Sequence, residues 1–497
     1  MNQKIKILIG ILIVGIVLIG GWWVWNQVFP EPETCIDSNE QCKGKPDGAS
    51  CTTGVWCDQF GRVCGGQSCV GMGSGKCFKG RCVSFKEYEN LARVAITTNV
   101  RIVKDDSKWV LLVDGRPFYI KGAGCGVYKG KNGEDYLLLA KELGANAVRT
   151  WGIDQGTREY LDTALKYGLK VSAGIWIDYA TPENKVSFLN DSYKKKKERE
   201  VLNYIQQFKD HPAVLMWGVG NECVYFTYSE KEKVALCKFI DHLARKIHQI
   251  DPDHPVMYAS SNFVELKYIK KYMPSIDIVG MNVYPSLRTC HSVWKSLRMD
   301  KPYILSEFGP PIYTQCPRDK NGLSFELSDK QKAVYYREII NQMYELKGYN
   351  LGGFVHHLGE TTQESMTWWN INYSFYKKYP YWIIYNLYTG KKPPNLPPLI
   401  EYMNLSRSKL KKGEFFEINF RVADPEGDPL HYEYKISTTQ EGVLKYYVNE
   451  FLHTKVKEEN GIVKIQAPLK KGVYRVYLFV YDDKGNVASL NKSIVVE

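Results

Sequence analysis

The sequence lacks the marks of several common protein classes. Histidine is scarce, with 9 residues in 497, and none of them lies between Cys35 and Cys82, where a zinc site would need nitrogen ligands or paired C-x2-C spacing. No nucleic-acid motif is present, and the densest positive run, residues 194–200, opens an amphipathic stretch typical of a solvated helix face. The segment GAGCG at 122–126 is a poor match to a phosphate-binding glycine loop. These absences disfavour a zinc module, a nucleic-acid binder and a doubly wound nucleotide-binding fold.

The longest hydrophobic run is at the N-terminus. It is uncharged from Ile7 to Trp25, follows Lys4 and Lys6, and is long enough to cross a bilayer. A cleaved signal peptide has a shorter apolar core and ends on small residues, whereas this run ends in bulky tryptophans. The alternative of a cleaved signal is therefore less favoured. We expect a single-pass transmembrane anchor (residues 1–30) that contacts the lipid bilayer through residues 7–25, with the body on the extracytoplasmic side of the cell membrane.

Cysteine is concentrated in one short segment. Of 13 cysteines, eight lie between Cys35 and Cys82, separated by Gly, Asp and Ser and by no hydrophobic run long enough to form a core. This pattern predicts a disulfide-rich module over residues 31–85 in an oxidising compartment, with a connectivity that the sequence alone cannot give. A further disulfide between Cys290 and Cys316 is expected on neighbouring loops.

Beyond a lead-in over residues 86–114, short apolar runs alternate strictly with longer amphipathic ones. Eight of each argue for a closed (β/α)8 TIM barrel over residues 115–392. The expected strands cover residues 118–124, 146–152, 170–177, 213–222, 255–260, 276–285, 302–309 and 351–359. The expected helices cover residues 133–143, 156–167, 194–209, 230–249, 262–272, 291–298, 329–346 and 377–388.

After the proline-rich segment KKPPNLPP, residues 393–497 show alternating strands and polar turns. This pattern predicts a β-sandwich of immunoglobulin or fibronectin type. Within it, ADPEGDPL at 423–430 could hold calcium through Asp424, Glu426 and Asp428. An ordinary turn with Pro and Gly in their usual places is the favoured interpretation.

Polar side chains end several of the expected barrel strands, at the face where TIM barrels carry their chemistry. The fourth strand, AVLMWGVGNE, ends on Asn221 and Glu222, and the seventh ends on Ser306 and Glu307. Two facing carboxyls can divide the cleavage of a glycosidic bond, because one protonates the leaving oxygen while the other stays ionised and attacks the sugar. We therefore expect Glu222 and Glu307 to be the catalytic pair.

The motifs around these glutamates resemble those of clan A glycoside hydrolases. GVGNE and ILSEFG look like the acid/base and nucleophile motifs, and LAKELGANAVRTWG is similar to family 2 enzymes and to β-1,3-glucanosyltransferases. A family 5-like catalytic barrel fits the same motifs. The resemblance implies that Glu222 is the acid/base and Glu307 the nucleophile, and that Asn221 binds the sugar 2-hydroxyl. It further implies that Arg149 keeps Glu307 ionised and that Tyr284 donates a hydrogen bond to it.

Other candidates come from aromatic groups near the strand ends. Trp151 and Trp176 are sugar platforms or core residues, and the sequence does not separate the two roles. Where many clan A enzymes carry a tryptophan platform after the last strand, this chain has His356 and His357, one of which must face away from the lumen. Trp368 is a candidate replacement for that platform.

Together these features predict a membrane-anchored, extracytoplasmic, retaining glycoside hydrolase that cleaves β-linked glycans by a two-glutamate double displacement. No metal or organic cofactor is implied, and an oligo- or polysaccharide is the expected substrate. Two alternatives stay open: a β-glucanosyltransferase-type transglycosylase, and a non-catalytic glycan-binding surface protein.

Overall fold

The computed structural model describes residues 50–52, 74–78, 81–84, 98–440 and 449–497, except residues 153, 155, 262 and 285. The chain divides into a unit of residues 1–97 and a unit of residues 98–497. In the first, β1 (Ser50–Thr52), β2 (Ser74–Phe78) and β3 (Arg81–Ser84) form an antiparallel sheet. The expected anchor (7–25) and the side chains of the cysteine module lie outside the described part. The described helices are all too short or too polar to cross a bilayer.

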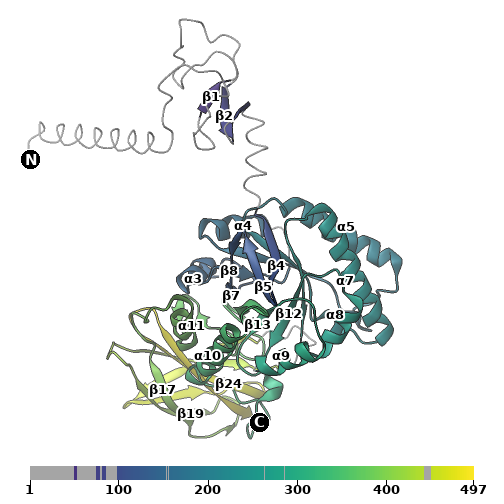
Figure 1. The fold of residues 1–497 in the computed structure, drawn as a ribbon. Coiled ribbons are helices and arrows are strands. Elements are labelled where there is room, and N and C mark those ends of the chain that lie inside the picture. Colours follow the sequence, from purple (N-terminus) through teal and green to yellow (C-terminus); the bar gives the residue numbers. More distant parts are fainter. Residues whose placement is uncertain are drawn as a thin grey trace, which may run out of the picture. The chain divides into compact units, whose positions relative to one another are not determined.

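Eight parallel strands of the second unit close into a barrel, which confirms the predicted TIM barrel (Figure 1). Their residues are almost all buried, as expected when helices cover the outside of a parallel sheet. The strands, in chain order, are β7 (Ile120–Gly124), β8 (Ala147–Arg149), β9 (Lys170–Ile175), β10 (Val214–Asn221), β11 (Val256–Ser260), β12 (Ile278–Val283), β13 (Tyr303–Phe308) and β14 (Asn350–Val355).

Amphipathic helices lie between these strands at the predicted positions. Several begin at side-chain caps visible in the sequence: Asn190, Ser229 and Ser328 each accept a backbone N–H of the first turn. The helices are α3 (Tyr136–Glu142), α4 (Thr157–Lys166), α5 (Asp191–Phe208), α7 (Glu230–Ile250), α8 (Leu266–Tyr272), α9 (Leu287–Ser296), α10 (Asp329–Glu345) and α11 (Tyr379–Thr389). A four-residue helix, α6 (Cys223–Phe226), directly after β10, was not predicted.

The lead-in is structured from residue 98 onward and is not a linker there. Strands β4 (Val100–Asp105), β5 (Lys108–Val113) and β6 (Arg116–Pro117) form an antiparallel sheet. Its apolar residues, including Leu111, join the cluster at the amino-terminal ends of the barrel strands, which includes Leu215. The sheet therefore closes the end of the barrel opposite to the carboxyl ends of its strands.

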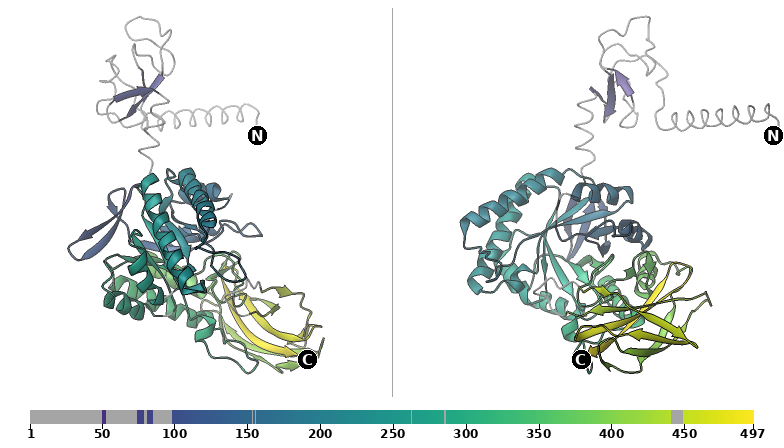
Figure 2. Two further views of the ribbon diagram at one scale, coloured as in Figure 1. Left: turned by 90° about the vertical axis from the view of Figure 1, so that its right-hand side faces the viewer. Right: turned by 180° about the vertical axis from the view of Figure 1, so that it is seen from behind.

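Residues from 399 to the C-terminus form two sheets packed face to face, a β-sandwich as predicted in outline (Figure 2). One sheet contains β17 (Leu399–Leu405), β19 (Phe415–Ala423), β23 (Ile462–Gln466) and β22 (Val456–Glu459). The other contains β18 (Lys409–Leu410), β25 (Val487–Val496), β24 (Gly472–Tyr481), β20 (His431–Thr438) and β21 (Phe451–Leu452). The immunoglobulin or fibronectin type stays a prediction.

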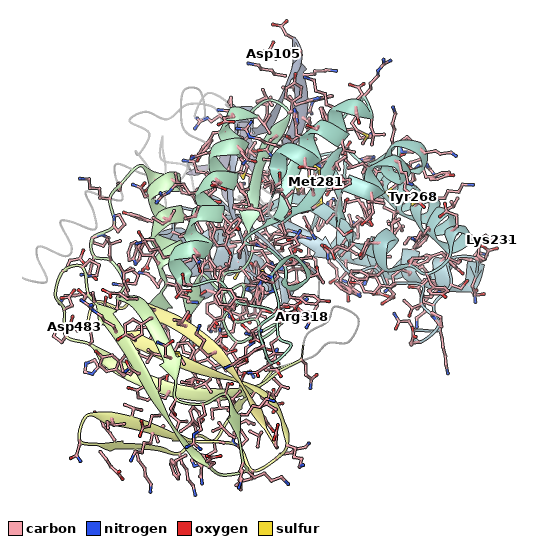
Figure 3. The ribbon with its side chains drawn as sticks, turned by 90° about the horizontal axis from the view of Figure 1, so that it is seen from below. Asp105, Lys231, Tyr268, Met281, Arg318 and Asp483 are labelled. Atoms are coloured by element: carbon pink, nitrogen blue, oxygen red, sulfur yellow. The ribbon has the colours of Figure 1, made fainter. Side chains whose placement is uncertain are left out.

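Buried polar groups join the sandwich to the barrel. Glu326, in the segment after β13, accepts hydrogen bonds from Lys332 of α10 at 2.7 Å and from Asn491 of β25 at 2.7 Å. In the same segment Asn321 donates to Ser493 of β25 at 2.8 Å, and Figure 3 labels Arg318 where this segment runs between barrel and sandwich. The positive charges of Lys332 and Arg475 outweigh burial and lower the pKa of Glu326 to about 2. The sandwich is thus built into the barrel rather than loosely appended.

The acidic turn of the sandwich matches its favoured interpretation. One carboxylate oxygen of Asp424 accepts the backbone N–H groups of Glu426 and Asp428, which holds the turn. Oxygens of Asp424, Asp428 and Asp482 lie within 4.8 Å of one another, and Glu426 is not part of this group. The Lys484 ammonium lies 3.8 Å from Asp428 and already supplies a positive charge.

Candidate active site

Glu222 is held at the end of β10 by an unusual backbone turn. Gly220 and Glu222 both have positive φ, 84° and 55°, so the strand stops abruptly and α6 begins at the next residue. The Glu222 amide donates to the Ala259 carbonyl on the neighbouring strand at 2.8 Å. Its carboxylate accepts a hydrogen bond from the Asn282 amide at 2.6 Å and is partly exposed. The turn therefore directs one carboxyl group, with one side-chain donor, into the mouth of the barrel.

Glu307, near the end of β13, is held by three donors. Arg149 and the Trp151 indole donate to Oε1 at 2.9 and 2.7 Å, and the Tyr284 hydroxyl donates to Oε2 at 2.8 Å. The glutamate is only 7% exposed. Both carboxylate oxygens are thus fixed in position, as a nucleophile requires.

Polar side chains link the two glutamates. Arg149 also donates to the Asn221 side-chain oxygen at 2.7 Å, so one guanidinium contacts the residue before Glu222 as well as Glu307. Asn282 on β12 lies opposite Glu307 on β13 in the strand register. Its side-chain oxygen accepts a hydrogen bond from the Ser306 hydroxyl at 2.7 Å, which orients its amide nitrogen toward Glu222. Because the Asn221 oxygen is occupied, its amide nitrogen is the group that remains to donate to a substrate.

The two carboxyls have opposite protonation tendencies. Burial, and then the negative charge of Glu307, raise the pKa of Glu222, while the Asn282 hydrogen bond lowers it less. Burial alone would raise the pKa of Glu307 too, but nearby positive charge and the donors Arg149 and Trp151 hold that pKa well below its usual range. Burial also lowers the pKa of His356. The imidazole is therefore neutral near pH 7, which leaves Arg149 as the cation that keeps Glu307 ionised. Such a split suits one acid and one nucleophile.

Aromatic rings surround Glu307. The His356 Nδ1 lies 3.8 Å from Glu307 Oε2, and the His357 ring stacks on Trp151 at 5.4 Å. Trp369 packs against His356 at 5.2 Å and Tyr284 at 5.0 Å. Five of the expected site residues therefore lie beside the catalytic pair: Arg149, Trp151, Asn221, Tyr284 and His356.

Trp368 is not one of the aromatic residues around Glu307. It is 2% exposed, its indole donates to the Pro311 carbonyl, and its ring lies under the Arg475 guanidinium of the sandwich. Trp368 thus packs against Pro311 and Arg475, whereas its neighbour Trp369 packs against His356 and Tyr284; the platform role of Trp368 stays a prediction. Adjacent residues face opposite ways, and the sequence offers no sign of which of two tryptophans turns inward.

Trp176 lies on the same rim, after β9, half-buried, with its ring 5.6 Å from Tyr179. Its role as a sugar platform stays a prediction. The expected Cys290–Cys316 disulfide is wrong: Cys290 is a free, buried thiol on the inward face of α9. Cys223, next to the acid, is buried and its thiol donates to the Ile177 carbonyl at 3.3 Å, which is a packing role.

Hydrogen bonds from residues behind the turn at Glu222 support it, and the sequence analysis did not predict these residues. The Val224 amide donates to the Tyr258 hydroxyl at 3.0 Å, and that hydroxyl donates to Glu265 at 2.6 Å. The other oxygen of Glu265 accepts the amide and hydroxyl of Ser261. Glu265 is buried on the short helix after β11, and its charge contributes to the raised pKa of Glu222.

Comparisons with known proteins find similarity to glycosyl hydrolases. Residues 106–316 match the family described as "Glycosyl hydrolases family 2, TIM barrel domain". β-Glucuronidase of Chlorocebus aethiops is 28% identical over 258 residues, covering 46% of this chain and 37% of that protein. Human β-glucuronidase is 29% identical over 230 residues, covering 41% of this chain and 32% of the relative. The chain therefore spans little more than a third of the length of the curated relatives that it matches.

A solved β-glucuronidase from Bacteroides uniformis aligns with 80% of this chain and 48% of its own, at 17% identity and a TM-score of 0.47. The stronger finding is the family match, which covers the expected acid/base Glu222, the expected nucleophile Glu307 and the arginine between them. Over residues 106–316 the barrel of this chain is therefore similar to the TIM-barrel domain of glycosyl hydrolase family 2, whose enzymes belong to the retaining clan A class.

Proposed function

We propose that this protein is a retaining β-glycoside hydrolase in which Glu222 is the acid/base and Glu307 the nucleophile. The observation that carries the proposal is the contrast between the two carboxyls. Glu307 is fixed by three donors and kept ionised, whereas Glu222, with one side-chain donor, tends to keep its proton. A non-catalytic glycan-binding barrel has no need of this contrast.

The mechanism follows from these positions. Glu222 protonates the glycosidic oxygen while Glu307 attacks the anomeric carbon and forms a covalent glycosyl-enzyme. Glu222, now ionised, removes a proton from water, which hydrolyses that intermediate and frees Glu307. Arg149, Trp151 and Tyr284 hold Glu307 in line for attack, and the Asn221 amide is placed to donate to a sugar hydroxyl. Retention requires the two carboxyl groups to lie about 5–5.5 Å apart.

The relatives suggest which substrate to test first. Those matched over the barrel are named β-glucuronidases, so a β-D-glucuronide heads the list, followed by β-glucosides, β-mannosides and β-galactosides. We propose an extracytoplasmic site of action on the basis of the N-terminal apolar run and the cysteine-rich segment. Recovery of the full chain in the salt-washed membrane fraction, and its release when residues 7–25 are deleted, tests this part.

The test of the mechanism uses the full chain and aryl β-glycosides of these four sugars. Glu307→Ala should lower kcat by at least about a thousandfold, since the nucleophile is lost. Azide added to Glu307→Ala should restore turnover and yield the α-glycosyl azide, which identifies the missing group. Glu338→Ala, which removes an exposed carboxylate on α10, is the matched control and should keep full activity. Proton NMR should show the β-anomer as the first product of the wild type, and an α-anomer would overturn retention.

Transfer to a second sugar is the alternative outcome of the same chemistry. The glycosyl-enzyme can be released by a sugar hydroxyl in place of water if an acceptor site exists beside Glu222. Product lengths from an oligosaccharide separate the two, because transfer yields products longer than the substrate.

A further inference from the structure

A row of aromatic side chains runs along the rim of the barrel beside the proposed acid. Successive ring centroids are 5.6 Å apart from Trp176 to Tyr179, 5.0 Å from Tyr179 to Phe226, and 5.1 Å from Phe226 to Tyr225. Tyr228 follows two residues beyond Phe226. We call these five residues the aromatic row. The mechanism described above assigns no role to any of the five.

The outer end of the row is open to solvent. Tyr225 is 54% exposed and Tyr228 is 80% exposed, whereas Trp176, Tyr179 and Phe226 are half-buried. A large exposed aromatic side chain is costly in water, and a group of them on one rim usually marks a binding surface. Core packing accounts for the inner rings but not for the two outer ones.

Hydrogen bonds hold together the two segments that carry the row. The Tyr228 amide donates to the Ala180 carbonyl at 3.0 Å, and the Ala180 amide donates to the Thr227 hydroxyl at 3.3 Å. The Cys223 thiol donates to the Ile177 carbonyl at 3.3 Å. Three hydrogen bonds thus join the loop after β9 to the segment after β10. The two segments would therefore lose little conformational entropy on binding a ligand.

Its position relates it to one half of a substrate. Tyr225 and Phe226 lie on α6, which begins at the residue after Glu222. In the proposed mechanism Glu222 gives its proton to the leaving-group oxygen, so the departing part of the substrate must lie at Glu222. The row lies on the segments that follow β9 and β10, and its exposed end is the part that follows Glu222 in the chain.

We propose that the aromatic row is the binding site for the leaving-group side of a β-linked oligosaccharide, with sugar rings stacked on Tyr225 and Tyr228. This inference rests on the proposed function, because the role of Glu222 as the acid decides which side of the cleaved bond the row binds. Aromatic faces suit the C–H faces of pyranose rings, and the tyrosine hydroxyls can bond to sugar hydroxyls. The substrate would then be a glycan chain several residues long, and a small glycoside would use only part of the site.

The kinetic test compares one oligosaccharide with one aryl glycoside of the same terminal sugar. The probes are β-linked gluco-, manno- and galacto-oligosaccharides of two to five residues and the matching aryl β-glycosides. In the double variant Tyr225→Ala/Tyr228→Ala, kcat/KM for the longest oligosaccharide turned over should fall about fivefold for each stacked ring, relative to the aryl glycoside. Tyr402→Ala, an exposed tyrosine on β17, is the control and should leave this ratio unchanged. An equal loss on both substrates, or no loss on the oligosaccharide, overturns the proposal.

A binding test separates this inference from the proposed function. Calorimetry on the full-length Glu307→Ala protein should show affinity that rises with oligosaccharide length, and the added Tyr225→Ala/Tyr228→Ala pair should abolish the rise. If the wild type turns over no glycoside, the proposed function fails, while a length-dependent affinity lost in the double variant still supports the row. Affinity independent of length overturns the row. If the double variant instead abolishes a self-association seen by sedimentation, with oligosaccharide binding unchanged, the row is a protein-binding surface.

Discussion

Asn282 and Glu265 act on the carboxyl of Glu222 in opposite directions. The Asn282 amide donates to Glu222 and favours its ionised form, whereas the buried charge of Glu265 disfavours it. Glu307 and Arg149 are the other charged groups that face Glu222, and they also oppose each other. The protonation of the proposed acid is therefore set by a balance among four side chains rather than by burial alone.

This balance predicts shifts of opposite sign in the pH profile. Activity requires protonated Glu222, so the alkaline limb of kcat/KM follows the raised pKa of that residue. Asn282→Ala removes a stabiliser of the carboxylate and should move the limb to higher pH, by roughly 0.3–1 unit. Glu265→Gln removes a negative charge and should move it lower by a similar amount. Glu338→Gln is the control, and shifts in the same direction for both variants would contradict the assignment of Glu222 as the acid.

At this scale the sequence predicts the residues on the ends of strands and misses those that act through a neighbour. Glu222, Glu307 and Arg149 stand out because a charged group ends an apolar strand. For Trp151 the sequence leaves a platform role and a core role open; the structure shows its indole donating to Glu307, a contact that depends on the side-chain rotamer. The partnership of Asn282 with Glu222 joins β12 to β10, and no local pattern reports such a contact.

The end of β10 is the element on which the proposed chemistry depends. The strand is fixed by parallel pairing with β9 and β11, and its last residues turn through two positive φ angles before α6. The pairing with β11 is irregular between Gly218 and Asn221, so the turn starts inside the strand. Alternation and length predicted all eight strands and helices, since each is a clear apolar or amphipathic run. The short α6 was missed because four residues show no helical period. The β4–β6 sheet was missed because its apolar runs, such as residues 109–113, lie before the alternating pattern of the barrel.

Gly220→Ala should separate activity from folding. At Gly220 φ is +84°, and an added Cβ would lie 3.0 Å from the Cys223 sulfur and 3.3 Å from the Tyr258 ring. The strain should cost about 1–2 kcal/mol, and the displaced Glu222 should lower kcat about a hundredfold. Gly115→Ala provides the matched control, because its φ is +76° with nothing within 4 Å and it lies far from the barrel mouth. Thermal unfolding and kcat are measured together; equal effects of the two variants on kcat would show that the turn does not position the acid.

On the scale of the whole unit, the barrel and the sandwich share a buried polar interface. Glu326 and Asp329, at the start of α10, bind Asn491 and Ser489 of β25, and Lys332 lies between them and the barrel. The sequence predicted a sandwich but not this contact, because Asn491 and Ser489 read as the solvent face of an alternating strand. Burial of that face is visible only when the barrel is in place.

Removing Glu326 should destabilise both parts together. Glu326→Ala leaves buried Lys332 without its carboxylate, at a cost of about 3–5 kcal/mol, seen as one lowered transition in calorimetry. Glu459→Ala, which breaks an exposed pair with Lys464, should change little. Because the folded-state pKa of Glu326 is depressed to about 2 from an ordinary 4.5, its contribution is present above pH 4.5 and lost as pH falls toward 2. A variant whose sandwich melts separately from an unchanged barrel would contradict the shared interface.

Because barrel and sandwich share an interface, a break in the proline-rich segment between them should not separate them. Lys391 and Lys392 are exposed there, within reach of a trypsin-like protease. A cut between Lys391 and Lys392 would divide the chain into two fragments, but Glu326, Asp329 and Asn321 of the first would still bind β25 of the second. The nicked protein would migrate as two bands in denaturing gels and as one species in gel filtration. We therefore expect the side-chain contacts of this interface to keep the molecule whole without a continuous backbone at this point.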